Sequence, residues 1–165
     1  MAENFSFDIV SDFDRQELVN TIDQVKREIS QRYDLKTTET IIDLEKESIC
    51  LTTNSELTLN AVIDILRQKT TKRKLSLNIF DFQPIEIVSG NRIKQIINLQ
   101  KGLNQEIAKK ISKEIRNEFK KINISIQGES LRVSSKSKND LQLVIKMLDI
   151  LSESLKIPLQ TNNYR

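Results

Sequence analysis

Apolar residues recur at two different spacings along the chain. They alternate with polar residues over residues 5–9, which predicts a strand, and recur every three or four positions over residues 18–29, which predicts a helix capped by Asp12 or Asp14. The first half continues with two short strands, a helix that begins at Asn54 or Ser55, and a last strand, at residues 41–44, 48–52, 55–66 and 77–79.

The second half of the chain repeats this order of elements. Gly128 lies at the turn between two of its strands, where a positive φ is inexpensive only for glycine. The predicted strand, helix, two strands, helix and strand of this half lie at residues 93–99, 104–120, 123–127, 130–134, 139–155 and 158–164.

The two halves also share individual residues at an offset of 82 positions. Leu59 corresponds to Leu141, and Leu66 corresponds to Leu148. Further matches pair Glu47 with Glu129, Ser48 with Ser130, Ser55 with Ser137, Val62 with Val144, and Ile63 with Ile145. Upstream the offset becomes 86, which indicates a loop of different length in the two halves. Self-similarity at a fixed offset indicates two units of one pattern.

A βαββαβ unit of this size typically folds into a ferredoxin-like arrangement, with a four-stranded antiparallel sheet and both helices on one face. We therefore predict an α+β protein built from two ferredoxin-like βαββαβ units. The first unit spans residues 1–84, a linker spans residues 85–91, and the second unit spans residues 92–165. Exchange of terminal strands between the units stays open, because the N-terminal and C-terminal strands have equivalent patterns.

Charge divides unevenly between the halves. The whole chain has a formal net charge of +3, but residues 1–91 carry −5 and residues 92–165 carry +8. A basic half favours a polyanionic partner that it contacts through phosphate groups. The alternative is that the cations of residues 109–121 only solvate the outer face of an amphipathic helix.

Polar residues also alternate along two strands of the basic half, where they share one face of the predicted sheet. Arg132 on this face can contact a phosphate or stack on a base, and Lys136 adds charge at the end of the strand. The alternative is a solvated sheet face without a ligand, since any half-exposed strand shows this alternation. The polar positions are Asn123, Ser125, Gln127, Arg132 and Ser134.

The composition excludes several classes of function. The sequence contains no histidine, one cysteine and three glycines. It therefore has no imidazole base, no intrachain disulfide, no Walker A or GxGxxG loop, and no multi-cysteine metal site. No catalytic residue, cofactor or metal is predicted. The N-terminal residues show no secretory signal, and no apolar run reaches the length of a membrane span, so we expect a cytoplasmic protein.

Several motifs in order resemble the YajQ family of bacterial proteins over the whole chain. In the first half they are residues 7–11 (FDIVS), 27–29 (REI) and 32–36 (RYDLK). In the second half they are residues 126–128 (IQG), 131–133 (LRV), Lys136 with 140–142 (DLQ), 158–160 (PLQ) and 163–165 (NYR). The resemblance implies two ferredoxin-like domains, a cytosolic bacterial setting and nucleotide binding without enzymatic activity. Proposed ligands of the family include tRNA, purine nucleotides and cyclic di-GMP.

Candidate ligand-binding residues combine outward polarity with a place in these motifs. They are Arg32 and Lys36 in the first half, and Gln127, Arg132, Lys136, Tyr164 and Arg165 in the second. The leading hypothesis is a non-enzymatic protein that contacts nucleotide or RNA phosphates. The alternative hypothesis is a protein-interaction adaptor or transcriptional co-regulator without a nucleotide ligand. The sequence predicts no particular oligomeric state.

Overall fold

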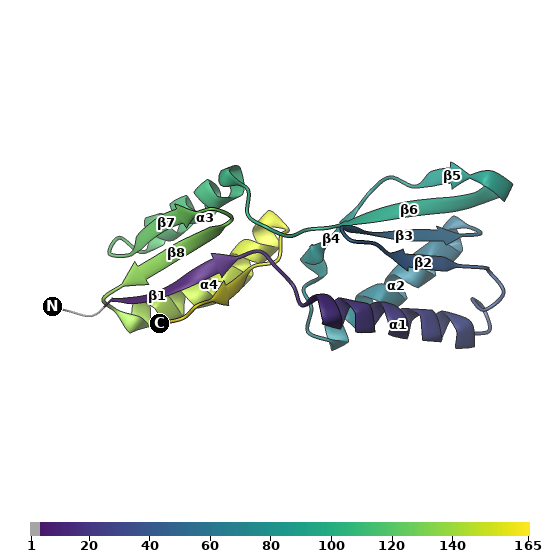
Figure 1. The fold of residues 1–165 in the computed structure, drawn as a ribbon, viewed down its shortest axis with the longest axis horizontal. Coiled ribbons are helices and arrows are strands. Elements are labelled where there is room, and N and C mark those ends of the chain that lie inside the picture. Colours follow the sequence, from purple (N-terminus) through teal and green to yellow (C-terminus); the bar gives the residue numbers. More distant parts are fainter. Residues whose placement is uncertain (1–3) are drawn as a thin grey trace. The chain divides into compact units, whose positions relative to one another are not determined.

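The computed structural model describes residues 4–165, and over these residues it contains four α-helices and two antiparallel sheets (Figure 1). The predicted α+β class is thus confirmed. The helices are α1 (Arg15–Gln31), α2 (Glu56–Lys72), α3 (Gln105–Glu118) and α4 (Lys138–Leu155). The strands are β1 (Phe5–Val10), β2 (Ile41–Leu44), β3 (Ser48–Thr53), β4 (Phe80–Phe82), β5 (Glu86–Val88), β6 (Arg92–Leu99), β7 (Asn123–Gln127), β8 (Ser130–Ser135) and β9 (Gln160–Asn162).

The first compact unit, which we call unit 1, contains residues 4–12 and 101–165. Its strands lie in the order β7-β8-β1-β9, and each neighbouring pair is antiparallel. Phe7 and Ile9 of β1 alternate toward one face, opposite Val133 and Leu131 of β8, and all four side chains are buried. The same cluster includes the apolar positions of α3 and α4, so both helices cover this one face.

The second compact unit, unit 2, contains residues 13–100. Its sheet has the order β2-β3-β6-β4, and β5 also pairs with β6. The buried face of the sheet carries Ile42, Ile49, Leu51 and Ile97, which pack with the apolar positions of α1 and α2. The arrangement of both units is consistent with the predicted ferredoxin-like architecture.

The structure divides the chain differently from the contiguous units at residues 1–84 and 92–165. Strand β1 pairs with β8 and β9 in the sheet of the second half, whereas β6 pairs with β3 and β4 in the sheet of the first. Strand β1 alternates apolar and polar residues, whereas β6 has the buried polar Gln95 between Ile93 and Ile97 on its core face. Neither pattern indicates which distant strand is the pairing partner.

The predicted linker at residues 85–91 is instead part of unit 2. Strand β5 lies within it and pairs with β6 from Glu86↔Lys94 to Val88↔Arg92, and Gly90 with a φ of 77° helps the chain turn between the two strands. The sheet of unit 2 therefore has five strands rather than the predicted four, while unit 1 has four. Pro84 and the short polar segment around Gly90 mark turns at the ends of this strand rather than a domain boundary.

Matching serines begin the second helix of each unit. Ser55 caps α2 by accepting a hydrogen bond from the backbone N–H of Thr58, and Ser137 caps α4 by accepting one from Asp140. These two serines are related by the sequence offset of 82 residues. A side-chain acceptor at this position satisfies a backbone donor that the helix itself leaves unpaired. The two units therefore share the N-terminal cap of their second helix as well as their apolar spacing.

The chain leaves unit 1 after Asp12 and returns to it at Lys101, and these two points are close together. The backbone N–H of Gly102 donates a 2.7 Å hydrogen bond to the carbonyl of Ser11, and Lys101 Nζ lies 3.6 Å from Asp12 Oδ1. Residues before and after the insertion are therefore neighbours within unit 1. Unit 2 is an insertion between the first strand of unit 1 and its first helix.

This geometry predicts that unit 1 folds without its insertion. A polypeptide that joins Asp12 directly to Lys101 should unfold cooperatively on heating, because it keeps every strand of the sheet. Residues 101–165 alone should not, because the buried Phe7 and Ile9 each contribute about 1.5–3 kcal/mol to the core. Thermal unfolding followed by circular dichroism distinguishes the two. Equal cooperativity of both polypeptides would contradict the central place of β1.

Candidate functional site

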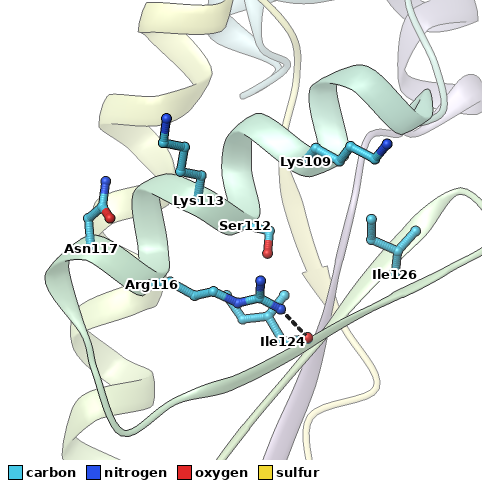
Figure 2. A pocket seen from close by; sticks show the side chains of 7 residues that line it. All are labelled: Lys109, Ser112, Lys113, Arg116, Asn117, Ile124 and Ile126. Carbon is cyan, nitrogen blue, oxygen red and sulfur yellow. Dashed lines mark hydrogen bonds between the residues drawn. The ribbon is translucent and has the colours of Figure 1, made fainter.

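A hollow of about 490 Å³ lies between helix α3 and strand β7 of unit 1. Figure 2 shows its lining side chains, with the cations extending from the helix and two isoleucines on the strand. We call this hollow the α3–β7 groove. Its lining residues are Lys109, Ser112, Lys113, Arg116, Asn117, Ile124 and Ile126.

The spacing of the residues in α3 produces this lining. Lys109, Lys113 and Arg116 are four and three residues apart, so they share one side of the helix. Ile111 and Ile115 point into the core and fix the rotation of the helix about its axis. The cations therefore lie along one exposed side of the helix, at the rim of the hollow beside β7.

Strand β7 supplies the apolar floor of the groove. Ile124 and Ile126 alternate toward the helix-covered face of the sheet, where Ile124 is buried and Ile126 is 40% exposed. In the described part of the chain, β7 is the outermost strand on its side of the sheet, so the groove lies at the sheet margin. The groove therefore combines cations on one wall with accessible apolar surface on the other.

Arg116 bridges the two walls of the groove. Its Nη2 donates a 2.9 Å hydrogen bond to the carbonyl oxygen of Ile124, drawn as a dashed line in Figure 2. A guanidinium group has five N–H donors, so the remaining donors stay available to an anion. This contact orients the guanidinium within the groove.

The electrostatic environment of the groove is uniformly positive. Its lining contains three cations and no carboxylate, and within the described part of the chain neither Lys109 nor Lys113 forms an ion pair. The neighbouring Lys110 instead pairs with Glu106, at 3.7 Å. Three uncompensated cations around one hollow favour an anion with more than one negative charge.

Unit 2 has a smaller hollow at the corresponding place, between α1 and β2. Its volume is about 180 Å³, and Lys26, Ser30 and Ile42 lie at the positions that Ser112, Arg116 and Ile124 occupy in unit 1. The loop that joins α1 to β2 is longer than the loop between α3 and β7, and it places Leu35 in the hollow with only 2% exposure. The longer loop therefore fills space that remains open in unit 1.

The predicted residues Arg32 and Lys36 both lie at this loop of unit 2. Lys36 lines the smaller hollow, and its Nζ lies 5.3 Å from the ring centre of Tyr33. Arg32 Nη2 pairs with Asp34 at 2.8 Å, and Arg32 also approaches Glu28. The hydrogen bond from Arg32 lowers the pKa of Asp34. The structure thus places Lys36 at a hollow and Arg32 in an ion pair with its neighbours.

Polar residues form three rows across the uncovered face of the unit 1 sheet. Strand register aligns Ser125, Arg132, Asp8 and Asn162 in the middle row. One flanking row contains Asn123, Ser134, Ser6 and Arg165. On the other flank Gln127 lies opposite Ser130, and Gln160 lies opposite the apolar Val10. The sequence analysis predicted that Gln127 and Arg132 share one face, and the register confirms it.

Asp8 is the buried centre of this polar face, with 6% exposure. Arg132 Nε donates to Asp8 Oδ1 at 3.0 Å, and Asn163 Nδ2 donates to Asp8 Oδ2 at 2.9 Å. These hydrogen bonds, above all that from Arg132, lower the pKa of the Asp8 carboxyl group. The charge of Arg132 is therefore largely matched by Asp8.

The remaining predicted residues lie at three separate places. Lys136 lines a hollow of about 440 Å³ with Lys121 and Ser137, at the start of α4. The ring of Tyr164 stacks on the buried Phe7 at 6.2 Å between centres and so contributes to packing. Arg165 exchanges two backbone hydrogen bonds with Ser6 of β1. The seven predicted residues are therefore not gathered in one cavity.

The sequence analysis assigned no ligand role to the groove residues Lys109, Lys113 and Arg116. It noted them as cations and gave solvation of a helix face as the alternative. A usable signal was present, since these cations recur at spacings of four and three residues along α3, and two apolar residues alternate in the following strand. The change of repeat offset from 86 to 82 also indicated the shorter loop of the second half, but the pattern did not show that this loop leaves a groove open.

Residues 4–165 contain neither a helix that could span a membrane nor a cluster of side chains that could hold a metal ion. No helix among residues 4–165 is long and apolar enough to cross a membrane. In the same residues, no group of three or more Asp, Glu or Cys side chains has a geometry that could hold a metal ion.

Comparisons with a family model and with individual proteins indicate the same family. A family model described as "Nucleotide-binding protein YajQ-like" matches residues 5–165. A nucleotide-binding protein of Prochlorococcus marinus subsp. pastoris (strain MED4) is 76% identical, and the alignment covers 100% of both chains. A nucleotide-binding protein of Prochlorococcus marinus (strain SARG) is 61% identical, again with complete coverage of both.

The Asp8–Arg132 pair predicts a pH-dependent contribution to stability. Asp8→Asn should lower the free energy of unfolding by about 1.5 kcal/mol at neutral pH, because Arg132 loses its charged acceptor. A carboxyl group with a lowered pKa stabilises the fold above its unfolded-state pKa of about 4, and this contribution disappears as the pH falls through the lower folded-state pKa. The deficit of the variant should therefore shrink in acid, as measured by urea unfolding at several pH values.

Asp34→Asn is a matched control, since Asp34 also pairs with an arginine but is exposed. Exposed ion pairs contribute little to stability, so this variant should show a much smaller deficit than Asp8→Asn, and its change with pH should be correspondingly small. A deficit of Asp8→Asn that did not change between neutral and acidic pH would contradict the assigned charge interaction.

Proposed function

The chain belongs to the family of YajQ-like nucleotide-binding proteins, and from this premise we propose that it binds a nucleotide through its phosphate groups in the α3–β7 groove. The observation that carries the proposal is the set of three cations around one hollow whose lining has no carboxylate. Phosphate oxygens accept hydrogen bonds from guanidinium and ammonium groups at close range.

Each groove residue has a distinct part in this proposal. Arg116, held by its hydrogen bond to Ile124, presents a planar set of donors to a phosphate. Lys109 and Lys113 add mobile point charges that adjust to the position of the anion. Ile126, which is partly exposed, offers apolar surface to the ring of a base.

The ligands implied by the family resemblance are cyclic di-GMP, purine nucleotides and tRNA, and all three present phosphate groups. The groove contains only Ser112 and Asn117 as uncharged polar side chains, so phosphate contacts outnumber base-reading contacts. Binding of tRNA at the groove should depend steeply on salt, because each phosphate contact releases counterions. A small nucleotide makes fewer contacts and should show a shallower dependence.

We propose that the bound nucleotide leaves chemically unchanged. General acid–base catalysis needs a group whose pKa lies near the operating pH, and the sequence contains no histidine. The groove lining offers neither a carboxylate nor a thiol for proton transfer or nucleophilic attack. The cytoplasmic setting stays a prediction from the resemblance.

The polar face of unit 1 is a second candidate site, because Gln127, Arg132 and Arg165 share it. Its charge is partly cancelled by the Asp8–Arg132 pair, which weakens its attraction for a phosphate relative to the groove. The two candidates make different predictions for substitutions, so one titration series separates them.

Lys113→Ala and Arg116→Ala should each weaken nucleotide binding by about 1.5–3 kcal/mol, which corresponds to roughly ten- to hundredfold in Kd. Each substitution removes a cation that would contact a phosphate. Calorimetric titration with cyclic di-GMP, GTP, ATP and bulk tRNA, at low and physiological salt, provides the measurement.

Lys110→Ala is the matched control, since Lys110 lies on the same helix but pairs with Glu106 and does not line the groove. Its affinity should match that of the parent protein. If Arg132→Ala weakened binding while the groove variants did not, the polar face would be the site. Loss of affinity in Lys110→Ala equal to that in Lys113→Ala would indicate a diffuse charge effect and contradict the groove.

A further inference from the structure

Strand β7 presents an unpaired edge directly beside the α3–β7 groove. Among residues 4–165 it pairs with β8 alone, so its other side lies at the margin of the unit 1 sheet. The strand has five residues, and it carries neither a proline nor a charged side chain. Proteins commonly protect an exposed edge with such residues, because an unpaired edge can accept another strand.

The direction of the backbone groups in β7 follows from its register with β8. A tight turn at Gly128 joins the two strands, and Gln127 opposite Ser130 closes it. Residues in an antiparallel pair alternate between those that bond to the partner strand and those that point away from it. The contact from Arg116 to the carbonyl of Ile124 identifies Ile124 as an outward-facing position, and Ile126 follows it at the same period.

The edge therefore offers a defined set of hydrogen-bonding groups. Within the described chain, the N–H of Ile124 and both backbone groups of Ile126 face away from β8, while the Ile124 carbonyl is occupied by Arg116. An added extended chain would pair with these groups and continue the sheet. Its side chains would alternate, with every second one on the helix-covered side of the sheet.

The cations beside the edge of β7 determine which side chains an added strand would need. Side chains on the helix-covered side would enter the groove and meet Lys109, Lys113 and Arg116. Acidic side chains at alternate positions would be complementary to these cations. We infer that the β7 edge of unit 1 is a docking site for an extended acidic peptide segment of a partner protein, bound by strand addition with its carboxylates in the groove.

A second copy of this chain is a poorer occupant of the edge. Pairing β7 with the β7 of another molecule would bring two grooves together, each lined by three cations and no carboxylate. Like charges at this distance repel each other. Charge complementarity therefore favours an acidic partner over self-association.

The inference extends beyond nucleotide binding, because it depends on backbone groups of β7 that a phosphate does not need. Both ligands would use the groove cations, so charge removal alone does not separate them. Removal of one outward N–H does, since it affects strand addition and leaves the cations in place. Ile126 is suited to this change, because its N–H faces away from β8.

The test compares Ile126→Pro with Ile126→Ala in the full-length protein. Proline removes the outward N–H and is tolerated at an edge position of this kind, whereas alanine removes the side chain and keeps the N–H. The probe is a fluorescein-labelled peptide of alternating Glu and Val, followed by fluorescence anisotropy. A peptide of alternating Lys and Val serves as the charge control, and thermal unfolding verifies that both variants fold.

The acidic peptide should bind the parent protein and Ile126→Ala, and its affinity for Ile126→Pro should be at least about tenfold lower. The basic peptide should not bind. Equal affinity of the acidic peptide for the two variants would overturn strand addition, as would dimerisation of the parent protein that Ile126→Pro abolishes. If Ile126→Pro fails to fold, the same peptide with N-methylated backbone amides replaces it, and undiminished binding of that peptide would overturn the inference.

Nucleotide titration of the same variants keeps this inference separate from the proposed function. Both variants lose the Ile126 side chain that the proposed function places against the base, so each should bind nucleotide more weakly than the parent protein by a similar factor, while the three groove cations are unchanged in both. Absence of nucleotide binding in every variant, together with the expected peptide result, would reject the proposed function and leave the docking site standing.

Discussion

The pairing of β1 with β8 and β9 is the constraint on which the rest of the structure depends. Because the first strand of the chain takes a central place in the sheet of unit 1, the chain must leave that unit and return to it later. The 2.7 Å hydrogen bond between Gly102 and Ser11 joins the departing and returning segments. Residues 13–100, which lie between these segments, form unit 2 with its own core. In the sheet of unit 2, β6 occupies the central position that β1 has in unit 1.

Sequence reasoning predicted the elements more accurately than their partners. Apolar periodicity located the helices, the hairpins and the α+β class, because these depend on residues close together in the chain. Strand exchange was left open, since the N-terminal and C-terminal strands have equivalent patterns. The linker prediction was wrong because Pro84 and Gly90 mark the ends of a short paired strand as readily as a domain boundary. Pairing between distant strands is a property of packing that a one-dimensional pattern does not contain.

The candidate site shows the same difference between local features, which the sequence predicted, and long-range contacts, which it did not. Outward polarity identified Arg132 correctly as a residue of the open sheet face, but its partner Asp8 is 124 residues away in the chain, so sequence spacing did not reveal the ion pair that offsets its charge. The cations of α3 were visible in the sequence as charges on a helix. Their value as a site depends on the neighbouring apolar strand and on the short loop before it, and the matching loop of unit 2 closes the equivalent hollow with Leu35.

The two units thus share one pattern of elements but differ in the space that each leaves for a ligand. Unit 2 uses its longer loop to fill part of the space between its first helix and edge strand, which leaves a hollow of about 180 Å³ instead of about 490 Å³. Unit 1 keeps that space open and surrounds it with cations, at a cost in self-repulsion that an anion would relieve. Arg116 links the two properties of unit 1, because its guanidinium both covers one carbonyl of the exposed edge and faces the groove. The hydrogen bond that orients Arg116 for an anion is thus the same one that occupies a carbonyl of the strand edge, so the groove and the edge share this residue.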